Sequence, residues 1–495
     1  MTWKVRLTIR YVDAEIFVYD ASFIHPSWFA ILAGITKVLE WISFVPARNG
    51  ETVPRLQTSD PITRKVTYTL SDGKKLDPRI AIAGCMDETT GAWVSGMFDK
   101  GSWIEAQSSW ARTVVTGRAR LGGIACGIIA VEVDTVMLDI PADPGMPDSS
   151  EKTVPQAGQV WFPDSALKTA HAMEEFDLEG LPLFVMANWR GFSGGQRDLF
   201  EGVLQAGSLI VENLRSYRRP VFMYIPPGCE LRGGAWVVID SQINPDQVES
   251  YADTTGKGGV LEPEGMVEIK FREKELVAAM HRLDPIIRQL SLKYKDNNHP
   301  DIKARVSKLL PVYTGIAQSF AQMHDTPVRM LAKGVIQGIV PWENSRNFFA
   351  TRLKRRLAEE ALYNHLRAAD SSITLLDAKH MVRAWFLTSP RVNSAKDHYG
   401  SMNIQLVSTN DMSDEDKVTA WSNDAAFMEW VESQNGAARI AVELKSLRQK
   451  SAAQLVATLS DTSEGTEGLI KGLESAIDSN PSLLLQLRNL VNLRS

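Results

Sequence analysis

Cysteine is scarce in this chain, and the few cysteines are scattered. Cys85, Cys126 and Cys229 are far apart, odd in number and form no C-x-x-C pair. This pattern argues against a disulfide framework and suits a reducing compartment. Cys126 and Cys229 lie in apolar or glycine-rich runs, so we interpret them as small core residues and not as nucleophiles. We therefore expect a cytoplasmic protein.

Long hydrophobic runs are missing as well. No stretch of eighteen apolar residues occurs, so we expect no membrane span. The N-terminus carries Lys4 and Arg6, but acidic residues from Asp13 onward interrupt the apolar residues after them, which makes a poor signal peptide.

Neither the charge balance nor the histidines point to nucleic acid or to a metal. The chain has 54 basic and 59 acidic residues, a net charge of −5, and so lacks the basic excess of a nucleic-acid-binding protein. The eight histidines are dispersed and none follows another at i+3 or i+4, so no zinc signature is present and no metal is expected. A Walker loop and a biotin-carrying lysine motif are also missing.

What remains is a globular composition with glycine-rich turns. The 495 residues are 44% apolar and 23% charged, which is typical of a soluble protein with two to four domains. The spacing of Gly191, Gly194 and Gly195 does not match the dinucleotide-binding fingerprint, so their turn needs another explanation.

The turn at residues 188–196 is the most informative stretch. Residues 181–187 form an apolar run of strand length, and apolar residues recur at helical spacing from Phe200 to Leu214, which predicts a helix of about twenty residues. The glycines allow a tight turn with exposed N–H groups, which suit a developing oxyanion at the positive end of the helix. Arg190 adds a fixed positive charge for a carboxylate or phosphate. By itself, such a turn is equally well explained as an ordinary connection between a strand and a helix in an α/β fold.

A second turn of the same kind changes that balance. Residues 221–225 form another apolar run, and Arg232 then precedes Gly233 and Gly234. Two successive strands thus each end in an arginine and paired glycines, an arrangement that can hold an anionic intermediate without a metal. Glu262 further along could be an acid–base group or a carboxylate that orients backbone or arginine.

Other patterns predict the surrounding elements. Strands are expected at 124–133 and 235–240, and helices at 165–176, at 246–251 and, with a loop before it, within 98–123. From Lys270 onward helical periodicity dominates. We interpret the basic run from Arg352 to Arg356 as a solvated helix face.

The residues of both turns resemble the carboxyltransferase region of eukaryotic-type multidomain acetyl-CoA carboxylases. The resemblance is carried by residues 110–123, 158–161, 188–198, 224–227, 231–238, 259–263, 333–336 and 352–360. It runs from about Gly34 to beyond residue 390. It implies an α/β fold, a crotonase-like β-β-α superhelix with a long helical C-terminal extension, that works as a head-to-tail dimer.

The resemblance also implies a chemistry. In that family CO2 passes from carboxybiotin to acetyl-CoA, giving malonyl-CoA for fatty acid synthesis, and backbone N–H groups hold the oxyanions, so no side-chain base is needed. Arg190 would contact the transferred carboxylate. The implied catalytic residues are Arg190, Gly233, Gly234 and Glu262. The implied substrate-binding residues are Trp161, Phe192, Gly194, Gly195 and Val203, of which Trp161, Phe192 and Val203 would line the acyl and biotin slot.

The match divides the chain into regions. Residues 1–33 are unmatched, 34–58 resemble the end of the carboxyltransferase N-terminal subdomain, 59–345 resemble the C-terminal subdomain, and 346–495 are the helical extension. Biotin is expected on another domain or chain, so the expected partners are a biotinyl carrier domain and an N-terminal subdomain or full-length carboxylase. Two interpretations stay open: a half-enzyme active with its complement, or a catalytically silent paralogue or fragment that dimerises with a full-length carboxylase and modulates it.

Overall fold

The computed structural model describes most of the chain. The described residues are 7–11, 14–18, 35–36, 38–45, 53, 55–70, 75–146, 148–294, 298–388, 391–393, 405–407, 421–480 and 482–492. The chain divides into two compact units, Met1–Ala350 and Thr351–Ser495, which are taken separately below.

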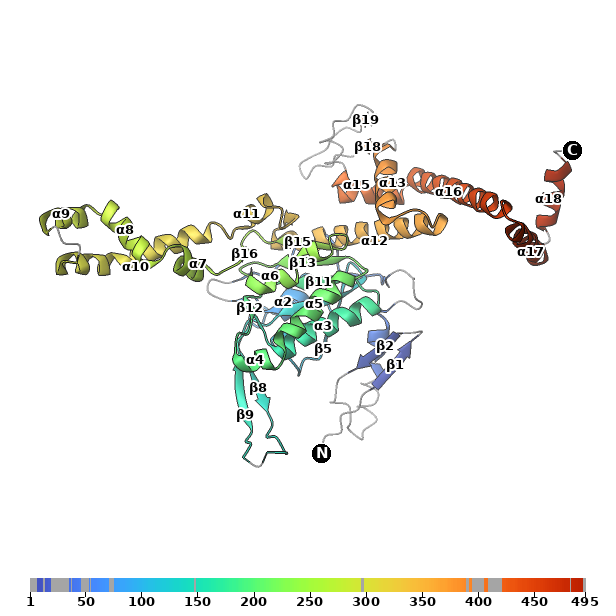
Figure 1. The fold of residues 1–495 in the computed structure, drawn as a ribbon. Helices are drawn as coiled ribbons and strands as arrows, with labels where there is room; N and C mark the ends of the chain where they lie inside the picture. Colours follow the sequence, from blue (N-terminus) through green and yellow to red (C-terminus); the bar gives the residue numbers. More distant parts are fainter. Residues whose placement is uncertain are drawn as a thin grey trace. The chain divides into compact units, whose positions relative to one another are not determined.

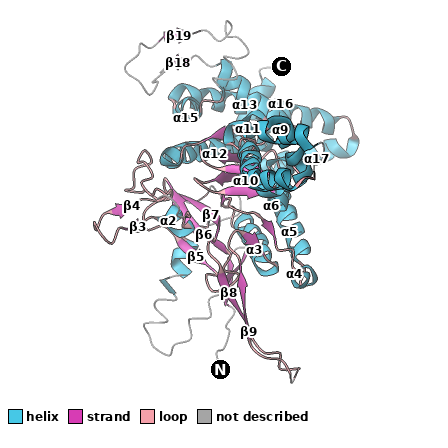
Figure 2. Ribbon diagram, turned by 90° about the vertical axis from the view of Figure 1, so that its left-hand side faces the viewer, coloured by secondary structure: helices cyan, strands magenta, loops and turns pink. Residues whose placement is uncertain are grey.

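A seven-stranded mixed sheet forms the centre of the first unit (Figure 2). Its strands, in spatial order, are β17 (Gly338–Ile339), β15 (Val248–Ala252), β13 (Val221–Ile225), β11 (Leu183–Met186), β7 (Ile124–Val131), β6 (Val114–Leu121) and β5 (Ile104–Ala106). Neighbours from β17 to β7 are parallel, whereas β5, β6 and β7 pair antiparallel. Strands β7, β11 and β13 are buried along their whole length, which explains why they read as continuous apolar runs.

Each of four parallel strands leads to a short second strand and then to helices. β7 leads, after the intervening strands β8 (Val136–Ile140) and β9 (Lys152–Gln156), to β10 (Val160–Trp161) and α3 (Pro163–Leu178). β11 is followed by β12 (Gly191–Phe192), α4 (Gln196–Phe200) and α5 (Val203–Ser216), β13 by β14 (Glu230–Arg232) and α6 (Gly233–Val238), and β15 by β16 (Lys257–Gly259) and α7 (Pro263–Lys270). The short strands pair among themselves in parallel, β10 with β12 and β14 with β16. This repeated β-β-α layering confirms the predicted α/β, crotonase-like fold.

Helices and aromatic side chains cover the two faces of the sheet. Phe176 of α3 packs so closely on Gly127 of β7 that a Cβ at that glycine would lie 2.4 Å from its ring. Another aromatic cluster is centred on Phe349, at the start of α12 (Ser345–Ala369), whose ring contacts Phe184, Phe222, Tyr224 and Tyr251 from three neighbouring strands. The first turns of α12 therefore belong to the sheet's own core.

Smaller antiparallel pairs and turns complete this unit. They are β1 (Leu7–Tyr11) with β2 (Ala14–Val18), β3 (Cys85–Met86) with β4 (Trp93–Val94), and β8 (Val136–Ile140) with β9 (Lys152–Gln156). Helix α2 (Pro78–Ala83) precedes β3, and the 3₁₀ turns are η2 (Ser241–Ile243) and η3 (Trp342–Asn344). The three cysteines are unpaired, and Cys126 and Cys229 are buried, as predicted.

Two predictions around the glycine-rich turns were wrong. Residues 235–240, expected as a strand, lie mostly in α6, because the chain leaves β14 at Gly233 with a left-handed φ of 49°. Val237, a residue of the expected strand, is 68% exposed in α6. The expected helix of about twenty residues after the first turn is broken into α4 and α5 at Gly202, which adopts φ 88°.

Two further predictions failed because polar residues occupy buried strands. The expected polar helix at 246–251 is β15, where the buried Glu249 accepts a hydrogen bond from the Tyr251 hydroxyl at 2.8 Å. The expected helix within 98–123 is β5 and β6, and Arg118 of β6 is buried against Glu179 of the chain beyond α3. For Arg118, a local pattern cannot reveal a partner 61 positions away in the sequence.

From α7 onward the first unit becomes helical, as predicted. Helix α10 (Pro300–Gln322) packs against α7, α8 (Glu273–Leu283) and α9 (Pro285–Tyr294), and α11 (Pro327–Ala332) follows (Figure 1). Buried side chains that include Val267, Met280 and Ile287 form their shared core.

The second unit is helical. Its elements are the remainder of α12, α13 (Leu375–Thr388), α15 (Asp424–Glu432), α16 (Gln434–Ser460), α17 (Ser463–Ser479) and α18 (Ser482–Asn492), with the short strands β18 (Arg391–Asn393) and β19 (Gln405–Val407). The interpretation of the basic run as a solvated face was wrong for Arg355. Its side chain is 2% exposed, bonds Glu359 at 2.9 Å and Asp424 at 2.9 Å, and lies over the Trp421 ring.

Candidate functional site

The two glycine-rich turns predicted from the sequence lie side by side. Strand β11 continues into Asn188, Trp189 and Arg190, which run next to β14. The Arg232 N–H donates to the Trp189 carbonyl at 2.8 Å, and the Glu230 N–H donates to the Asn188 side-chain oxygen at 3.1 Å. The ends of two neighbouring parallel strands thus bring both arginines of the sequence pattern into one place.

Arg190 presents a half-exposed positive charge at this place. Its backbone N–H donates to the Gln159 carbonyl at 2.8 Å, which fixes the main chain. Its Nε donates to Glu230 Oε1 at 2.7 Å, and Glu262 Oε1 lies 3.6 Å from the same nitrogen. The Arg190 side chain is 51% exposed, so a ligand can approach it from solvent.

Arg232 is the buried counterpart. Its side chain is 2% exposed, and it donates to Glu230 at 3.0 Å, to Asp325 at 2.6 Å and to the Leu261 carbonyl at 3.1 Å. Burial by itself lowers the pKa of Arg232, but the hydrogen bonds to Asp325 and Glu230 outweigh it and raise the pKa above its ordinary value. Arg232 is therefore a permanent buried cation.

The glycines of both turns serve different needs. At Gly233 a Cβ would meet the Val260 carbonyl at 3.3 Å, and the left-handed φ of 49° disfavours any other residue. At Gly234 a Cβ would sit 3.4 Å from the Phe192 ring, in ordinary contact. Gly194 has no neighbour within 4 Å of such a Cβ, so the surface above it is open. Gly195 is the N-cap of α4.

Three aromatic rings pack against one another at the first turn. Trp161 stacks on Trp189 with ring centroids 4.1 Å apart and lies 5.0 Å from the Phe192 ring. Trp161 and Val203 are fully buried, whereas Phe192 is half-buried. Of the three residues expected to line the acyl and biotin slot, Phe192 is therefore the one that reaches the surface.

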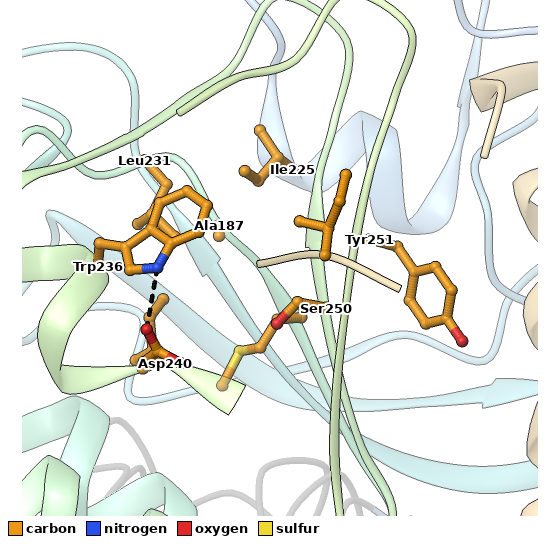
Figure 3. A pocket seen from close by; sticks show the side chains of 10 residues that line it. Ala187, Ile225, Leu231, Trp236, Asp240, Ser250 and Tyr251 are labelled. Atoms are coloured by element: carbon orange, nitrogen blue, oxygen red, sulfur yellow. Dashed lines mark hydrogen bonds between the residues drawn. The ribbon is translucent and has the colours of Figure 1, made fainter. Parts of the chain in front are cut away.

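A small cavity lies next to the second turn. It is lined by Ala187, Met223, Ile225, Leu231, Trp236, Ile239, Asp240, Ser250, Tyr251 and Ile336. Figure 3 shows Trp236 directed toward Asp240, to which its Nε1 donates at 3.2 Å. Its volume of about 10 Å³ has room for no more than one water molecule, so the cavity is not a substrate site.

The structure brings the predicted catalytic residues together. A Cβ added at Gly233 would lie 3.8 Å from the Arg190 carbonyl oxygen and 3.3 Å from the Val260 carbonyl oxygen. Glu262 Oε1 lies 3.6 Å from Arg190 Nε, so Arg190, Gly233 and Glu262 are close to one another. Sequence reasoning missed Glu230, Asn188 and Asp325. Glu230 lies between buried Cys229 and Leu231, and successive side chains of a strand point to opposite faces. This alternation was the signal in the sequence that the Glu230 side chain faces the turn.

The described residues offer neither a metal site nor a membrane-spanning helix. In that part of the chain no group of three or more histidine, cysteine or acidic side chains is placed to hold a metal ion. No helix within it combines the length and the apolarity needed to cross a bilayer.

The sequence matches the family model of the carboxyl transferase domain over residues 30–357. The chain belongs to this family. The matched stretch includes both turns, Glu230 and Glu262.

The chain is similar to acetyl-CoA carboxylases of two plants and of Dictyostelium discoideum. The chain is 47% identical over 468 residues to acetyl-CoA carboxylase 2 of Oryza sativa subsp. japonica, and the aligned stretch covers 92% of this chain and 19% of that protein. It is 48% identical over 459 residues to acetyl-CoA carboxylase 1 of Arabidopsis thaliana, covering 90% and 19%. For the acetyl-CoA carboxylase of Dictyostelium discoideum the identity is 47% over 394 residues, covering 76% and 17%. The chain thus spans about a fifth of the length of these relatives.

Among solved structures, the transcarboxylase 12S crystal structure with methylmalonyl-coenzyme A and methylmalonic acid bound is similar. The TM-score is 0.46 at 17% identity, covering 66% of this chain and 51% of that chain.

Proposed function

We propose that this chain is the carboxyltransferase part of an acetyl-CoA carboxylase, which transfers a carboxyl group from carboxybiotin to acetyl-CoA and so forms malonyl-CoA for fatty acid synthesis. The observation that carries the proposal is the half-exposed Arg190, held by Glu230 between two glycine-rich turns. Arginine is suited to a carboxylate because its planar guanidinium can bind both oxygens. The identity to acetyl-CoA carboxylases across this stretch supports the choice of substrate.

The site residues have distinct proposed roles. Arg190 binds the carboxylate of malonyl-CoA and orients it. The backbone at Gly233 and Gly234 approaches the acyl group closely because no side chain intervenes, and its N–H groups stabilise negative charge on the thioester oxygen. Glu262, at the N-cap of α7, is a polar support next to Arg190.

The surface beside Phe192 fits a biotin carried on another domain or chain. Phe192 offers a half-buried ring, and the open space above Gly194 leaves room for a flat bicyclic group next to it. Biotin, when bound, supplies the activated carboxyl group. Phe192 and Gly195 position that group and exclude water from it, while buried Trp161 and Val203 hold Phe192 and α5 in place.

The proposed partners are a biotinyl carrier domain, a carboxyltransferase N-terminal subdomain, and a second copy of the chain in a head-to-tail dimer. An exposed apolar stripe along α10 and its C-cap supports the dimer: Val312, Ile316, Phe320 and Met323 are 56%, 61%, 47% and 61% exposed and recur at spacings of one helical turn. We place the protein in the cytoplasm, which its three unpaired cysteines support.

Decarboxylation of malonyl-CoA tests the proposed function. The purified chain is assayed with and without a separately expressed N-terminal carboxyltransferase subdomain, and complex formation is checked by size-exclusion chromatography. Activity of the mixture is expected, and Arg190→Ala is expected to lower kcat/KM about a hundredfold because a charge-assisted contact to the carboxylate is lost. Arg215→Ala, which removes an exposed ion pair with Glu212 on α5, is the matched control. A confirmed complex without activity would overturn the proposal and favour a silent partner.

A further inference from the structure

Glu230 divides its two carboxylate oxygens between two different arginines. Oε1 accepts from Arg190 Nε at 2.7 Å, and Oε2 accepts from Arg232 Nε at 3.0 Å. Its main chain is fixed as well, because its N–H is bonded to Asn188. With a side chain only 14% exposed, Glu230 has little freedom to leave this position.

Arg232 acts as the fixed anchor of the arrangement. Asp325 and the Leu261 carbonyl hold its Nη1, whereas its Nε bonds Glu230. A buried arginine that loses an acceptor leaves an unpaired charge, which is costly, so Arg232 retains Glu230 in preference to any other acceptor. Glu230 is thereby tied to the core on one side while its other oxygen reaches the exposed Arg190.

Glu262 differs from Glu230 in each of these respects. It lies 3.6 Å from Arg190 Nε, makes no hydrogen bond to it among the described contacts, and its side chain is 41% exposed. An incoming carboxylate can therefore displace Glu262 by simple rotation into solvent. Displacing Glu230 would instead disrupt both arginine contacts.

We infer that Glu230 is a positioning residue for the carboxyltransferase reaction. By occupying Nε, it fixes the plane of the Arg190 guanidinium and leaves the two terminal nitrogens for the substrate carboxylate. Among the described contacts these terminal nitrogens make no hydrogen bond. Because a carboxylate binds an arginine best through two parallel N–H groups, a fixed guanidinium plane lowers the entropy lost on binding. This inference rests on the proposed function.

The Glu230→Gln variant separates positioning from general structural damage. A glutamine keeps one acceptor oxygen but places an NH2 group where the second oxygen was. The buried Arg232 keeps the oxygen, so Arg190 is the arginine that loses its acceptor. Glu201→Gln is the matched control, because Glu201 forms an exposed ion pair with Arg197 on the neighbouring α4.

The assay compares two ligands that differ by one carboxylate. Malonyl-CoA decarboxylation is measured with the N-terminal subdomain present, and acetyl-CoA is added as a competitive inhibitor. For Glu230→Gln the KM for malonyl-CoA is expected to rise about tenfold, whereas the inhibition constant of acetyl-CoA, which has no free carboxylate, changes less than about twofold. Glu201→Gln is expected to match the wild type in both constants.

Other results would overturn the inference. An equal rise in both constants would assign Glu230 a merely structural role, and unchanged constants would assign it none. A wild-type mixture without activity would refute the proposed function instead, and crystal structures of the wild type and Glu230→Gln then decide the positioning role. Arg190 is expected to leave its wild-type position in the variant while Arg232 stays in place. An unmoved Arg190 would refute the role.

Discussion

The Asp99 carboxylate accepts a hydrogen bond from the Arg346 guanidinium at 2.7 Å, although 247 positions separate the two residues. Both side chains are buried, with exposures of 4% and 0%. Asp99 also accepts the backbone N–H groups of Gly122 and Gly123 at 2.9 and 2.7 Å. One carboxylate therefore joins the start of α12 to the turn between β6 and β7.

Removing the Asp99 charge is expected to destabilise the first unit. Asp99→Asn leaves the buried Arg346 charge without its closest partner, so the free energy of unfolding should fall by about 3–5 kcal/mol. Urea unfolding followed by tryptophan fluorescence measures this change. The control is Asp134→Asn, whose carboxylate is 81% exposed and should shift stability by less than about 0.5 kcal/mol. Equal stability of the two variants would contradict the prediction.

Glu175 of α3 is expected to make stability depend on pH. Burial raises the pKa of Glu175 from 4.5 to about 7, an effect that the Arg118 charge reduces and the Glu179 charge reinforces. Arg118 Nε donates a hydrogen bond to Glu179 Oε2 at 2.7 Å, whereas Glu175 Oε2 lies 3.9 Å from Arg118 Nη2. Between the ordinary pKa of 4.5 and the raised pKa of about 7, Glu175 is more often protonated in the folded chain than in the unfolded chain. The stabilisation is thus complete below pH 4.5 and is lost as the pH rises through 7.

Glu175→Gln removes this titration. The stability of the wild type relative to the variant should fall by about 2–3 kcal/mol between pH 5 and pH 8, since one pKa unit corresponds to 1.36 kcal/mol and the side chain is partly exposed. Urea unfolding at several pH values measures the difference. Glu174→Gln, at the exposed neighbouring position, provides the control and should give a constant difference. A constant difference for Glu175→Gln as well would show that Glu175 does not titrate in this range.

The apolar stripe of α10 is expected to support the proposed dimer. Ile316 is 61% exposed, so Ile316→Asp should leave the protomer folded and disrupt only an interface that covers this face. Sedimentation velocity at micromolar concentration should show a dimer for the wild type and a monomer for the variant. Met146→Asp, in the loop between β8 and β9 and 63% exposed, should remain dimeric. A dimeric Ile316→Asp protein would place the interface elsewhere.

Local sequence was sufficient for elements whose physics is local. Strands β7 and β13 are buried on both sides, so only apolar residues satisfy them, and their runs were recognisable without a structure. The turn at Gly233 was recognisable because a left-handed backbone and a close carbonyl demand glycine. Arg190 was identified as a charge that suits a carboxylate or phosphate, and its contact with the transferred carboxylate was implied by the family resemblance.

Charged residues in buried places account for most of the errors. The charges of Arg118, Glu249 and Arg355 are costly to bury, yet each has a hydrogen-bond partner in the folded chain. For Arg118 and Arg355 the fold supplies Glu179 and Asp424 from distant parts of the sequence. Val237 failed in the opposite direction: its side chain looked like part of a buried strand and lies exposed on a helix.

The sequence by itself determined the two glycine-rich turns of this protein, the apolar strands that lead into them and the position of Arg190 in the first turn, because apolar patterning and glycine conformation act over a few residues. Only the tertiary structure decided which acid holds that arginine. Glu230 and Glu262 are both near glycine-rich turns in the sequence, but only Glu230 stands on the strand paired with the end of β11 and bonded to buried Arg232. Hydrogen bonds between distant segments depend on which strands become neighbours, and that is settled by the packing of the whole sheet.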